Sequence, residues 1–330
     1  MKTRQLGPFD VSEISLGCMN LSHAYGSPPD DAYSDKLLNR ALDIGYTMLD
    51  TAALYGFGAN ETLLGKSIMH RRDEFVLASK CGLFKDAEGK REINGRPDKI
   101  RSTCEDSLRR LNTDVIDLYY LHRWDKQVPI EDSVGALKDL VEQGKIRTIG
   151  LSEVSSETLR KAHAVHPVTA LQTEYSLWTR NPEISVLDTC KELGVAFVAF
   201  SPLGRGFLGG KLLDVTHFEE KDIRRQMPRF DVENYQHNLK LLDGLKPIAE
   251  ASHCSLPQLS MAWLLQRDDH IIPIPGTTKI EHMEENLAAA DVHLDQETMD
   301  QLDILINQNL VHGGRYNASV QAEIDTEEFE

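Results

Sequence analysis

Hydrophobic positions along this chain follow two alternating patterns. Short runs rich in β-branched and other apolar residues recur almost to the C-terminus, and between them apolar residues are spaced three and four positions apart. The first pattern predicts buried strands and the second predicts amphipathic helices, so together they predict a parallel sheet with helical crossovers. Eight strands are predicted, over residues 13–17, 46–51, 75–80, 115–122, 146–152, 170–175, 196–201 and 271–274.

Two further helical patterns, over residues 234–251 and 296–307, fall outside this alternation and predict two additional helices on the outside. The opening residues predict a β-hairpin, because two short extended stretches flank a Pro-Phe-Asp turn. Eight strand–helix units in 330 residues favour an α/β fold of the (β/α)8 TIM barrel type. A doubly wound sheet is less favoured, because such enzymes usually add a second domain.

The domain organisation follows from the absence of any Pro/Gly/Ser-rich linker in the sequence. We expect one barrel domain over residues 1–330, with the N-terminal hairpin capping one end of the barrel. A partly irregular tail is expected over about residues 309–330. Its acidic end, residues 323–330, is predicted to be frayed.

The charge balance limits the partners of this protein. The chain carries 36 Lys and Arg against 52 Asp and Glu, a formal net charge of −16 with a sequence pI near 5.2. Such a field repels nucleic acid and anionic lipid, so we expect no nucleic-acid partner and no membrane partner. The five cysteines are widely spaced and the N-terminal residues lack an apolar signal, which is typical of a cytoplasmic protein with reduced thiols.

A G-x-G-x-x-G string occupies residues 204–209, directly after the predicted strand 196–201. A Rossmann fingerprint would open a helix and lead to a second strand with an acidic residue about 20 positions on. The residues that follow are too charged and irregular for such a helix, so the glycines form either a flexible loop over a ligand or a plain turn. We expect residues 205–229 to be a mobile loop that closes over a bound cofactor.

Four ionisable residues stand at or just after the C-terminal ends of predicted strands, where barrel enzymes carry their catalytic groups. They are Asp50, Tyr55, Lys80 and His122. Each alone has an ordinary structural explanation. In that reading Asp50 caps a loop and Tyr55 packs by its ring, while Lys80 is solvated and His122 is a core histidine. Together they suit protonation of an oxygen on which negative charge develops. An ammonium lowers the pKa of a nearby tyrosine, a carboxylate keeps the lysine charged, and a histidine donates to a carbonyl oxygen.

At residues 50–65 the sequence D-T-A-A-L-Y-G-F-G-A-N-E-T-L-L-G is similar to the D-T-A-x-x-Y-G-x-G-x-N-E-x-x-L-G signature of the aldo-keto reductase superfamily. The resemblance covers nearly the whole chain, and further matching segments occur in the family's order. They are residues 16–19, 80–82, 119–123, 144–147, 150–152, 201–204, 274–279 and 284–286.

The resemblance implies a (β/α)8 barrel that binds NADPH, in preference to NADH, across its C-terminal face. It also implies reduction of an aldehyde or ketone to an alcohol, with the cofactor carrying the hydride. In the family pattern Tyr55 is the general acid, Lys80 and Asp50 tune it, and His122 orients the substrate carbonyl.

The same resemblance implies which residues hold the cofactor. Ser152 and Gln172 match positions that bind the nicotinamide carboxamide, and Phe200 matches the aromatic residue that stacks on the ring. Residues 201–206 match the segment near the pyrophosphate, and residues 276–286 match the adenosine end with its 2′-phosphate. The implied set is Met19, Asp50, Ser152, Gln172, Phe200, Ser201, Pro202, Leu203, Gly204, Arg205, Gly206, Lys211, Gly276, Thr277, Thr278, Lys279, His282, Glu285 and Asn286.

Three parts of the chain depart from the family pattern. Glu153 stands where many members have Asn, next to an implied nicotinamide contact. Leu121 stands where related sequences often have Gln, on the substrate side. Gly276 and His282 stand where well-known members carry Lys and Arg, so Lys279 is the cation expected near the 2′-phosphate.

Two other functions stay open. The main alternative is a nucleotide-binding regulatory subunit, like the β subunits of potassium channels, which resemble this family yet can carry Asn at the position of His122. The complete set of four ionisable residues argues for catalysis instead. A hydrolytic or isomerase barrel is poorly supported, because the strand ends lack paired carboxylates. The sequence also shows no spacing typical of a metal site, and His163 with His166 is expected on the surface at a helix end.

The substrate is expected to be a small-molecule carbonyl compound of apolar or aromatic character, because apolar and aromatic side chains fall in the loops at the barrel mouth. Any of these side chains could equally be loop packing. The sequence does not indicate the oligomeric state. The candidate pocket residues are Leu54, Tyr55, Phe84, His122, Trp124 and Trp178.

Overall fold

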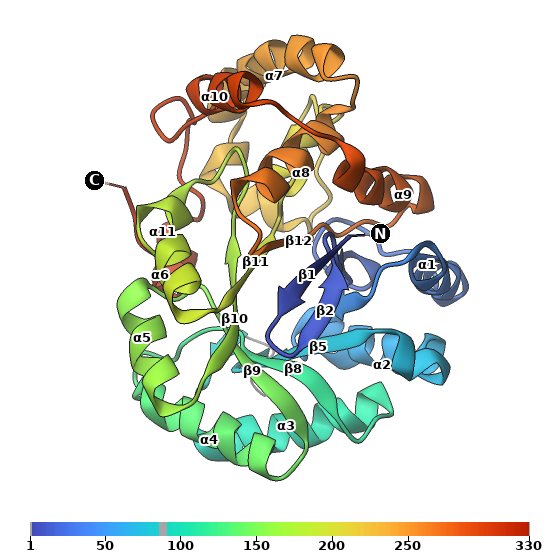
Figure 1. Cartoon of the computed structure of the whole chain (residues 1–330), viewed down its shortest axis with the longest axis vertical. Coiled ribbons are helices and arrows are strands. Elements are labelled where there is room, and N and C mark those ends of the chain that lie inside the picture. Colours follow the sequence, from blue (N-terminus) through green and yellow to red (C-terminus); the bar gives the residue numbers. More distant parts are fainter. Residues whose placement is uncertain (1, 86–90, 330) are drawn as a thin grey trace.

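The computed structural model describes residues 2–85 and 91–329, in which eight parallel strands form a barrel (Figure 1). The Ser15 N–H donates to the Pro273 carbonyl at 2.9 Å and the Gly17 N–H to that of Pro275 at 3.2 Å. The segment of the first strand therefore meets the last strand, and the predicted (β/α)8 architecture is confirmed. The strands are β3 (Leu16–Gly17), β4 (Met48–Asp50), β5 (Val76–Cys81), β8 (Ile116–Leu121), β9 (Ile146–Ser152), β10 (Val168–Glu174), β11 (Ala196–Phe200) and β12 (Ile271–Ile274).

Helices surround this barrel and carry the chain from one strand to the next (Figure 1). Two of them, α7 and α10, are the helices that the sequence predicted outside the alternation, and they pack against each other at the periphery. Within the described residues, no helix combines the length and the apolar character needed to cross a membrane. The helices are α1 (Asp31–Ile44), α2 (Ala59–Ser67), α3 (Pro97–Leu111), α4 (Ile130–Glu142), α5 (Ser156–Val165), α6 (Val186–Leu193), α7 (Val232–Ala251), α8 (Leu256–Arg267), α9 (Ile280–Ala288), α10 (Gln296–Leu305) and α11 (Ala318–Gln321).

The predicted N-terminal hairpin is present and consists of β1 (Thr3–Leu6) and β2 (Phe9–Ser12). It lies across one end of the barrel (Figure 1). Leu6 pairs with Phe9, so the turn falls one residue earlier than the Pro-Phe-Asp motif suggested. Leu6 and Val11 are completely buried against the apolar residues inside the barrel. The hairpin therefore closes the end opposite the strands' C-terminal ends.

Two chain segments differ from the prediction. The first strand is shorter than the predicted range 13–17, because only Leu16 and Gly17 pair with β4. The predicted fraying of residues 323–330 is also contradicted within its described part, because Ile324 and Thr326 are buried. An apolar side chain and hydrogen bonds to a buried glutamate, described below, hold this acidic segment on the barrel.

A second hairpin, which the sequence did not predict, follows β5. It consists of β6 (Leu83–Lys85) and β7 (Arg91–Ile93), which pair antiparallel. Because it directly follows a barrel strand at its C-terminal end, the hairpin stands beside the mouth of the barrel.

Candidate active site

The four ionisable residues predicted at strand ends lie together at the mouth of the barrel. Asp50 ends β4, Lys80 is the penultimate residue of β5, and His122 directly follows β8. The Lys80 Nζ donates to a carboxylate oxygen of Asp50, to the Thr51 carbonyl at 2.9 Å and to the Tyr55 hydroxyl at 3.2 Å. All of these side chains are buried. We call Asp50, Tyr55, Lys80 and His122 the catalytic cluster.

The loop after β4 brings the tyrosine back over the barrel. It forms a tight turn over Tyr55–Gly58, in which Gly56 has a φ of 57° and a Cβ there would stand 3.1 Å from the Cβ of Ser22. Asn60 then fastens the loop: its Oδ1 accepts from the Thr51 hydroxyl at 2.6 Å and its Nδ2 donates to the Cys18 carbonyl at 2.9 Å. The glycine and asparagine of the motif therefore act by fixing where the tyrosine hydroxyl lies.

Burial dominates the electrostatics of this cluster. It raises the pKa of Tyr55 above its ordinary value, and the neighbouring ammonium of Lys80 only partly opposes that rise. Burial disfavours the charged form of Lys80 as well, but Asp50 and Tyr55 outweigh it, so the pKa of Lys80 is raised. The sequence analysis expected the lysine to lower the tyrosine pKa. Lys80 does lower the pKa of Tyr55, but the loss of water around the hydroxyl raises it by more. The hydroxyl therefore stays protonated at neutral pH.

His122 completes the cluster as a neutral imidazole. Burial lowers its pKa well below the ordinary value, and Arg123, Lys80 and Arg91 lower it further. Its ring stands edge-on to that of Tyr55, with 5.8 Å between centroids. In the described part of the chain its buried Nδ1 has no hydrogen-bond partner. A neutral imidazole carries one N–H, which suits it to donate to a carbonyl oxygen.

A cavity of about 1250 Å³ opens above this cluster and extends along the C-terminal face of the barrel. Most of the residues that the sequence analysis assigned to the site line it. Gly204, Thr278 and Lys279, assigned to the cofactor, do not line it. The predicted residues on its walls are Met19, Asp50, Leu54, Tyr55, His122, Ser152, Gln172, Phe200, Ser201, Pro202, Leu203, Arg205, Gly206, Lys211, Gly276, Thr277, His282, Glu285 and Asn286.

The predicted nicotinamide contacts lie directly beside the catalytic cluster. Gln172 on β10 donates through Nε2 to Asp50 Oδ2 at 2.8 Å, so its amide also holds the carboxylate that pairs with the lysine. The Ser152 hydroxyl at the end of β9 accepts from Arg123 Nη1 at 3.3 Å. Phe200 ends β11 and lines the same cavity. These side chains follow one another on adjacent strands along the rim, and their contact with nicotinamide stays a prediction.

The far end of the cavity has features that fit a dinucleotide phosphate. A Cβ at Gly276 would come within 2.9 Å of Asn20 Oδ1, so the backbone there lies close to the opposite wall. Helix α9 follows Lys279 without a side-chain cap, which leaves its first N–H groups free of a side-chain acceptor. Burial, Lys211 and Lys279 lower the pKa of His282, which shows that both ammonium groups lie near this imidazole. The residues present therefore fit the cofactor that the resemblance implied.

The predicted substrate pocket needs correction. Trp178 is buried beneath the mouth and stacks on Phe207, with ring centroids 4.2 Å apart. Trp124 donates from Nε1 to the Val128 carbonyl at 2.9 Å, and Phe84 packs near the Lys99 ammonium. None of these three aromatic residues lines the cavity. Trp124 bonds within its own loop, Trp178 packs against the loop after β11, and Phe84 packs near α3, so these rings pack against the protein rather than the cavity.

The predicted loop over residues 205–229 is tied down at both ends. Arg205 and Arg229 are largely buried, and the G-x-G-x-x-G string forms a tight turn rather than a Rossmann helix. Between them, the Ile223 N–H donates to the Ala24 carbonyl at 3.1 Å, so the segment crosses to the loop after β3. Residues 211–221 are mostly exposed, and several line the cavity. The segment thus covers the cavity, and its mobility stays a prediction.

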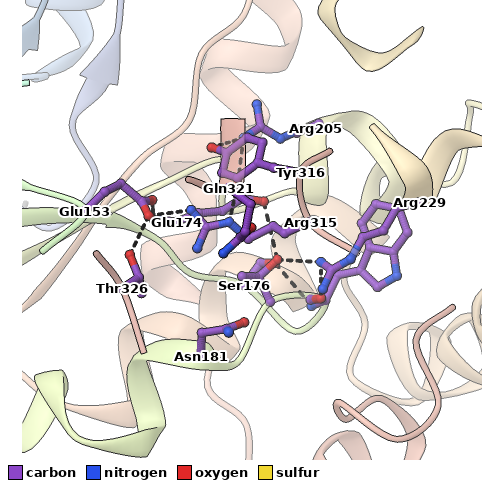
Figure 2. Close-up of polar contacts among 12 residues, drawn as sticks. Glu153, Glu174, Ser176, Asn181, Arg205, Arg229, Arg315, Tyr316, Gln321 and Thr326 are labelled. Carbon is purple, nitrogen blue, oxygen red and sulfur yellow. Dashed lines mark hydrogen bonds and ion pairs between the residues drawn. The ribbon is translucent and has the colours of Figure 1, made fainter. Parts of the chain in front are cut away.

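A second buried charged cluster lies on the other half of the rim, and the sequence analysis missed it (Figure 2). Glu153 follows β9 and Glu174 ends β10, and both are buried. Arg315 donates to Glu153 at 2.5 Å, and Arg205 donates to Glu174 at 2.6 Å. The Tyr316 ring lies between the two guanidinium groups, at 5.4 Å from that of Arg205 and 4.7 Å from that of Arg315. We call Glu153, Glu174, Arg205 and Arg315 the rim cluster.

The rim cluster has direct consequences for two predictions. Arg205 was assigned to the cofactor, but its guanidinium pairs with Glu174 and donates to the Tyr316 hydroxyl at 2.9 Å. Glu153, which replaces the asparagine of the family pattern, accepts from the Thr326 hydroxyl at 2.6 Å. The Asp325 N–H donates to the Glu153 carbonyl at 2.9 Å. The departure from the family pattern therefore serves to hold the C-terminal segment across the barrel mouth.

Comparison with known proteins gives the same assignment as the geometry. A sequence model described as the aldo/keto reductase family matches residues 13–307. The NADP(+) aldo-keto reductase yakc of Schizosaccharomyces pombe is 43% identical over 320 residues, covering 95% of this chain and 94% of that protein. The chain belongs to the aldo/keto reductase family.

Solved structures of the family share its architecture. The glycerol dehydrogenase AKR11B4 from Gluconobacter oxydans aligns with a TM-score of 0.85 at 29% identity, covering 92% of this chain and 94% of that one. An aldo-keto reductase from Klebsiella pneumoniae in complex with NADPH aligns with a TM-score of 0.73 at 28% identity, covering 96% and 98%. The barrel is thus the architecture of a known family of reductases.

Several residues on the cavity wall were missed by the sequence analysis of this family member. Arg123 directly follows His122 in a matched segment, so its position was a usable signal. Arg91, Tyr316 and Asn317 also line the cavity. They come from the unpredicted hairpin and from the C-terminal tail, where no local pattern indicated a role.

Proposed function

We propose that this chain is an NADPH-dependent oxidoreductase that reduces an aldehyde or ketone to the alcohol. The proposal rests chiefly on one observation: Lys80 Nζ contacts both the Asp50 carboxylate and the Tyr55 hydroxyl, in a buried cluster that opens into the cavity. Family membership and the complex of a related reductase with NADPH support the choice of cofactor.

The cofactor would lie along the cavity with its nicotinamide beside the catalytic cluster. Ser152, Gln172 and Phe200 would hold the nicotinamide end. The segment 276–286 would hold the adenosine end, with Lys211 and Lys279 near the 2′-phosphate. When bound, NADPH supplies the hydride.

The chain's own part in the reaction is to hold the carbonyl and to move one proton. The Tyr55 hydroxyl donates its proton to the carbonyl oxygen as negative charge develops there. Lys80 stabilises the tyrosinate that remains, because its ammonium lies 3.2 Å from that oxygen. Asp50 keeps the lysine charged, and Gln172 holds Asp50 through its second carboxylate oxygen.

His122 supports the same step from the other side of the substrate. Its pKa is lowered well below the ordinary value, so it acts as a hydrogen-bond donor rather than as a cation. Donation to the carbonyl oxygen orients the substrate toward Tyr55 and stabilises the developing charge.

The proposal is tested by following NADPH absorbance with a panel of aldehydes, ketones and sugars. We expect consumption of NADPH with at least one compound, and we expect Tyr55→Phe to lower its rate by about 10²–10⁴-fold. NADPH should still bind to the variant, because only the transferable proton is removed.

Two outcomes would count against this proposal. Turnover of Tyr55→Phe within about tenfold of the parent would exclude Tyr55 as the acid. Tight NADPH binding without consumption by any compound would instead favour a regulatory nucleotide-binding subunit.

A further inference from the structure

The walls of the cavity near the catalytic cluster carry positively charged side chains. Two arginines, Arg91 and Arg123, line the cavity there. Among the described lining residues, the acidic ones are Asp50, which pairs with Lys80, and Glu220, Asp222 and Glu285, which belong to the covering segment and to α9. Although the chain has a net charge of −16, two cations line this cavity and both influence His122 of the catalytic cluster.

Arg123 is held in place through a part of its guanidinium. Its Nη1 donates to the His122 carbonyl at 2.7 Å and to the Ser152 hydroxyl at 3.3 Å. Both acceptors are neutral, and within the described residues the buried Nε has no hydrogen-bond partner. A guanidinium has five N–H donors. In the described part of the chain Arg123 thus has no hydrogen-bonded carboxylate, although the nearby Glu153 feels its charge and has a lowered pKa.

Arg91 stands on β7 at the edge of the same wall. Its guanidinium pairs with Glu323 of the C-terminal segment at 2.6 Å, and the arginine side chain is 38% exposed. One carboxylate occupies at most two of the five donors of an arginine, so a second anion can bind to the same guanidinium. Burial lowers the pKa of Arg91, Arg123 lowers it further, and the neighbouring Glu323 only partly opposes them.

The two arginines influence the same catalytic side chain, that of His122. Both lower the pKa of His122, so both lie close enough to influence the imidazole that faces the substrate. A cation near a reacting carbonyl stabilises negative charge on the oxygen and also attracts a substrate that carries an anion elsewhere.

We propose that the preferred carbonyl substrate carries an anionic group, a carboxylate or a phosphate, and that Arg91 binds this group while Arg123 adds to the attraction. Glu323 then competes with the substrate for the guanidinium of Arg91. This inference rests on the proposed carbonyl reduction, and it replaces the expectation of a purely apolar substrate.

The test compares two substrates that differ in charge and share a reacting group. One is 4-carboxybenzaldehyde and the other is its neutral methyl ester, both with saturating NADPH. We expect kcat/KM to be about tenfold or more higher for the carboxylate, a size typical of a charge-assisted hydrogen bond. Glyceraldehyde 3-phosphate against glyceraldehyde provides the matched pair for a phosphate.

Two variants give opposite expected results. Arg91→Met should lower kcat/KM for the anionic aldehyde, through KM, by about tenfold or more beyond any change seen with the ester. Glu323→Gln should raise kcat/KM for the anionic aldehyde, because it removes the competing carboxylate. The control is Lys126→Met: Lys126 donates to the Ala322 and Ile324 carbonyls of the same tail but does not line the cavity.

The outcomes separate recognition of an anion from anchoring of the tail. If Arg91→Met and Glu323→Gln lower activity equally on charged and neutral aldehydes, the pair only anchors the C-terminal segment and the inference is overturned. Equal kcat/KM for the members of both substrate pairs overturns it as well. Failure to reduce even the neutral aldehydes would instead contradict the proposed function.

Discussion

The barrel mouth carries two clusters of buried charged side chains, and the two clusters serve different purposes. The catalytic cluster lies on β4, β5 and β8, and the rim cluster lies on β9, β10 and the C-terminal segment. In both, a buried carboxylate meets a cation, as burial of charge requires. The catalytic cluster also leaves a hydroxyl, that of Tyr55, on the wall of a cavity.

In the rim cluster, by contrast, the carboxylate of Glu153 bonds to other groups of the chain. Glu153 accepts from the Arg315 guanidinium, the Thr326 hydroxyl and the Glu174 N–H. These partners come from β10 and from two points of the C-terminal segment, which the carboxylate thereby holds together (Figure 2). A buried ion pair is thus chemically useful when a neighbouring hydroxyl keeps a transferable proton at a cavity, and structural when its carboxylate bonds only to groups of the chain.

The largest effect on activity is expected when the catalytic cluster loses its cation, in Lys80→Met. The rate of carbonyl reduction should fall about 10²–10⁴-fold, because the tyrosinate would lose the ammonium that stabilises it. Single-turnover measurement of NADPH oxidation checks this, with NADPH affinity as the control. A rate within about tenfold of the parent would contradict the proton-donor role of this cluster.

Next in size is Arg315→Met, which should cost about 3–5 kcal/mol of folding stability because Glu153 would stay buried without its cation. Urea unfolding measures the loss. The double variant Arg315→Met with Glu153→Gln should recover a large part of it, since the buried charge is then gone. The exposed pair of Lys161 with Glu157 is the matched control, and Lys161→Met should change stability little.

The rim cluster should also leave a signature in the pH dependence of stability. Burial alone would raise the pKa of Glu153, but Arg315 and Arg123 outweigh it, and the pKa lies below the ordinary value. The stability that this carboxylate contributes is therefore complete above its unfolded pKa of about 4.3, and is lost as pH falls through the lower folded pKa. The stability difference between the parent and Glu153→Gln should accordingly shrink below about pH 4. A difference that grows in acid would contradict this assignment.

A smaller effect, confined to cofactor choice, is expected outside both clusters. Lys279→Ala should weaken NADPH binding about tenfold or more and change NADH little, because the cation lies near the expected 2′-phosphate. Lys211→Ala is the comparison variant, since both ammonium groups lie near His282. Cofactor titration by fluorescence measures each affinity. Equal losses for NADPH and NADH would show that Lys279 acts structurally, at the start of α9.

The smallest effect concerns motion of the segment over residues 205–229. Arg205 and Arg229 fix its ends, so amide hydrogen exchange should slow on NADPH binding mainly in residues 211–221. Exchange that is equally fast with and without NADPH across those residues would show that the segment is no lid.

The catalytic cluster was predictable because each member is placed by its own strand end. The pattern of apolar runs locates the ends of β4, β5 and β8, and parallel strands bring those ends to one rim. Asp50, Lys80 and His122 therefore had to meet, and the turn after β4 returns Tyr55 to them. The family resemblance assigned Ser152 and Phe200 to the cofactor, and both line the cavity wall.

The rim cluster and the substrate wall were not predictable in this way. Glu153 and Arg315 are 162 positions apart, and nothing in the tail indicates where it crosses the barrel. The aromatic residues assigned to the pocket failed for a related reason. An aromatic side chain is equally stable on a cavity wall or against another ring, and Trp178 finds Phe207 beneath the mouth.

The sequence by itself determined the barrel, the order of its strands and the residues that face one another around the first half of the rim. Those features depend on local periodicity and on the short range of hydrogen bonding between adjacent strands. Only the tertiary structure decided that the acidic tail is buried at Thr326, that Arg205 pairs with Glu174, and that Arg91 lines the same cavity as the proton donor. Each of these depends on polar contacts between segments far apart in the chain, and the desolvation imposed by the finished packing selects the partners.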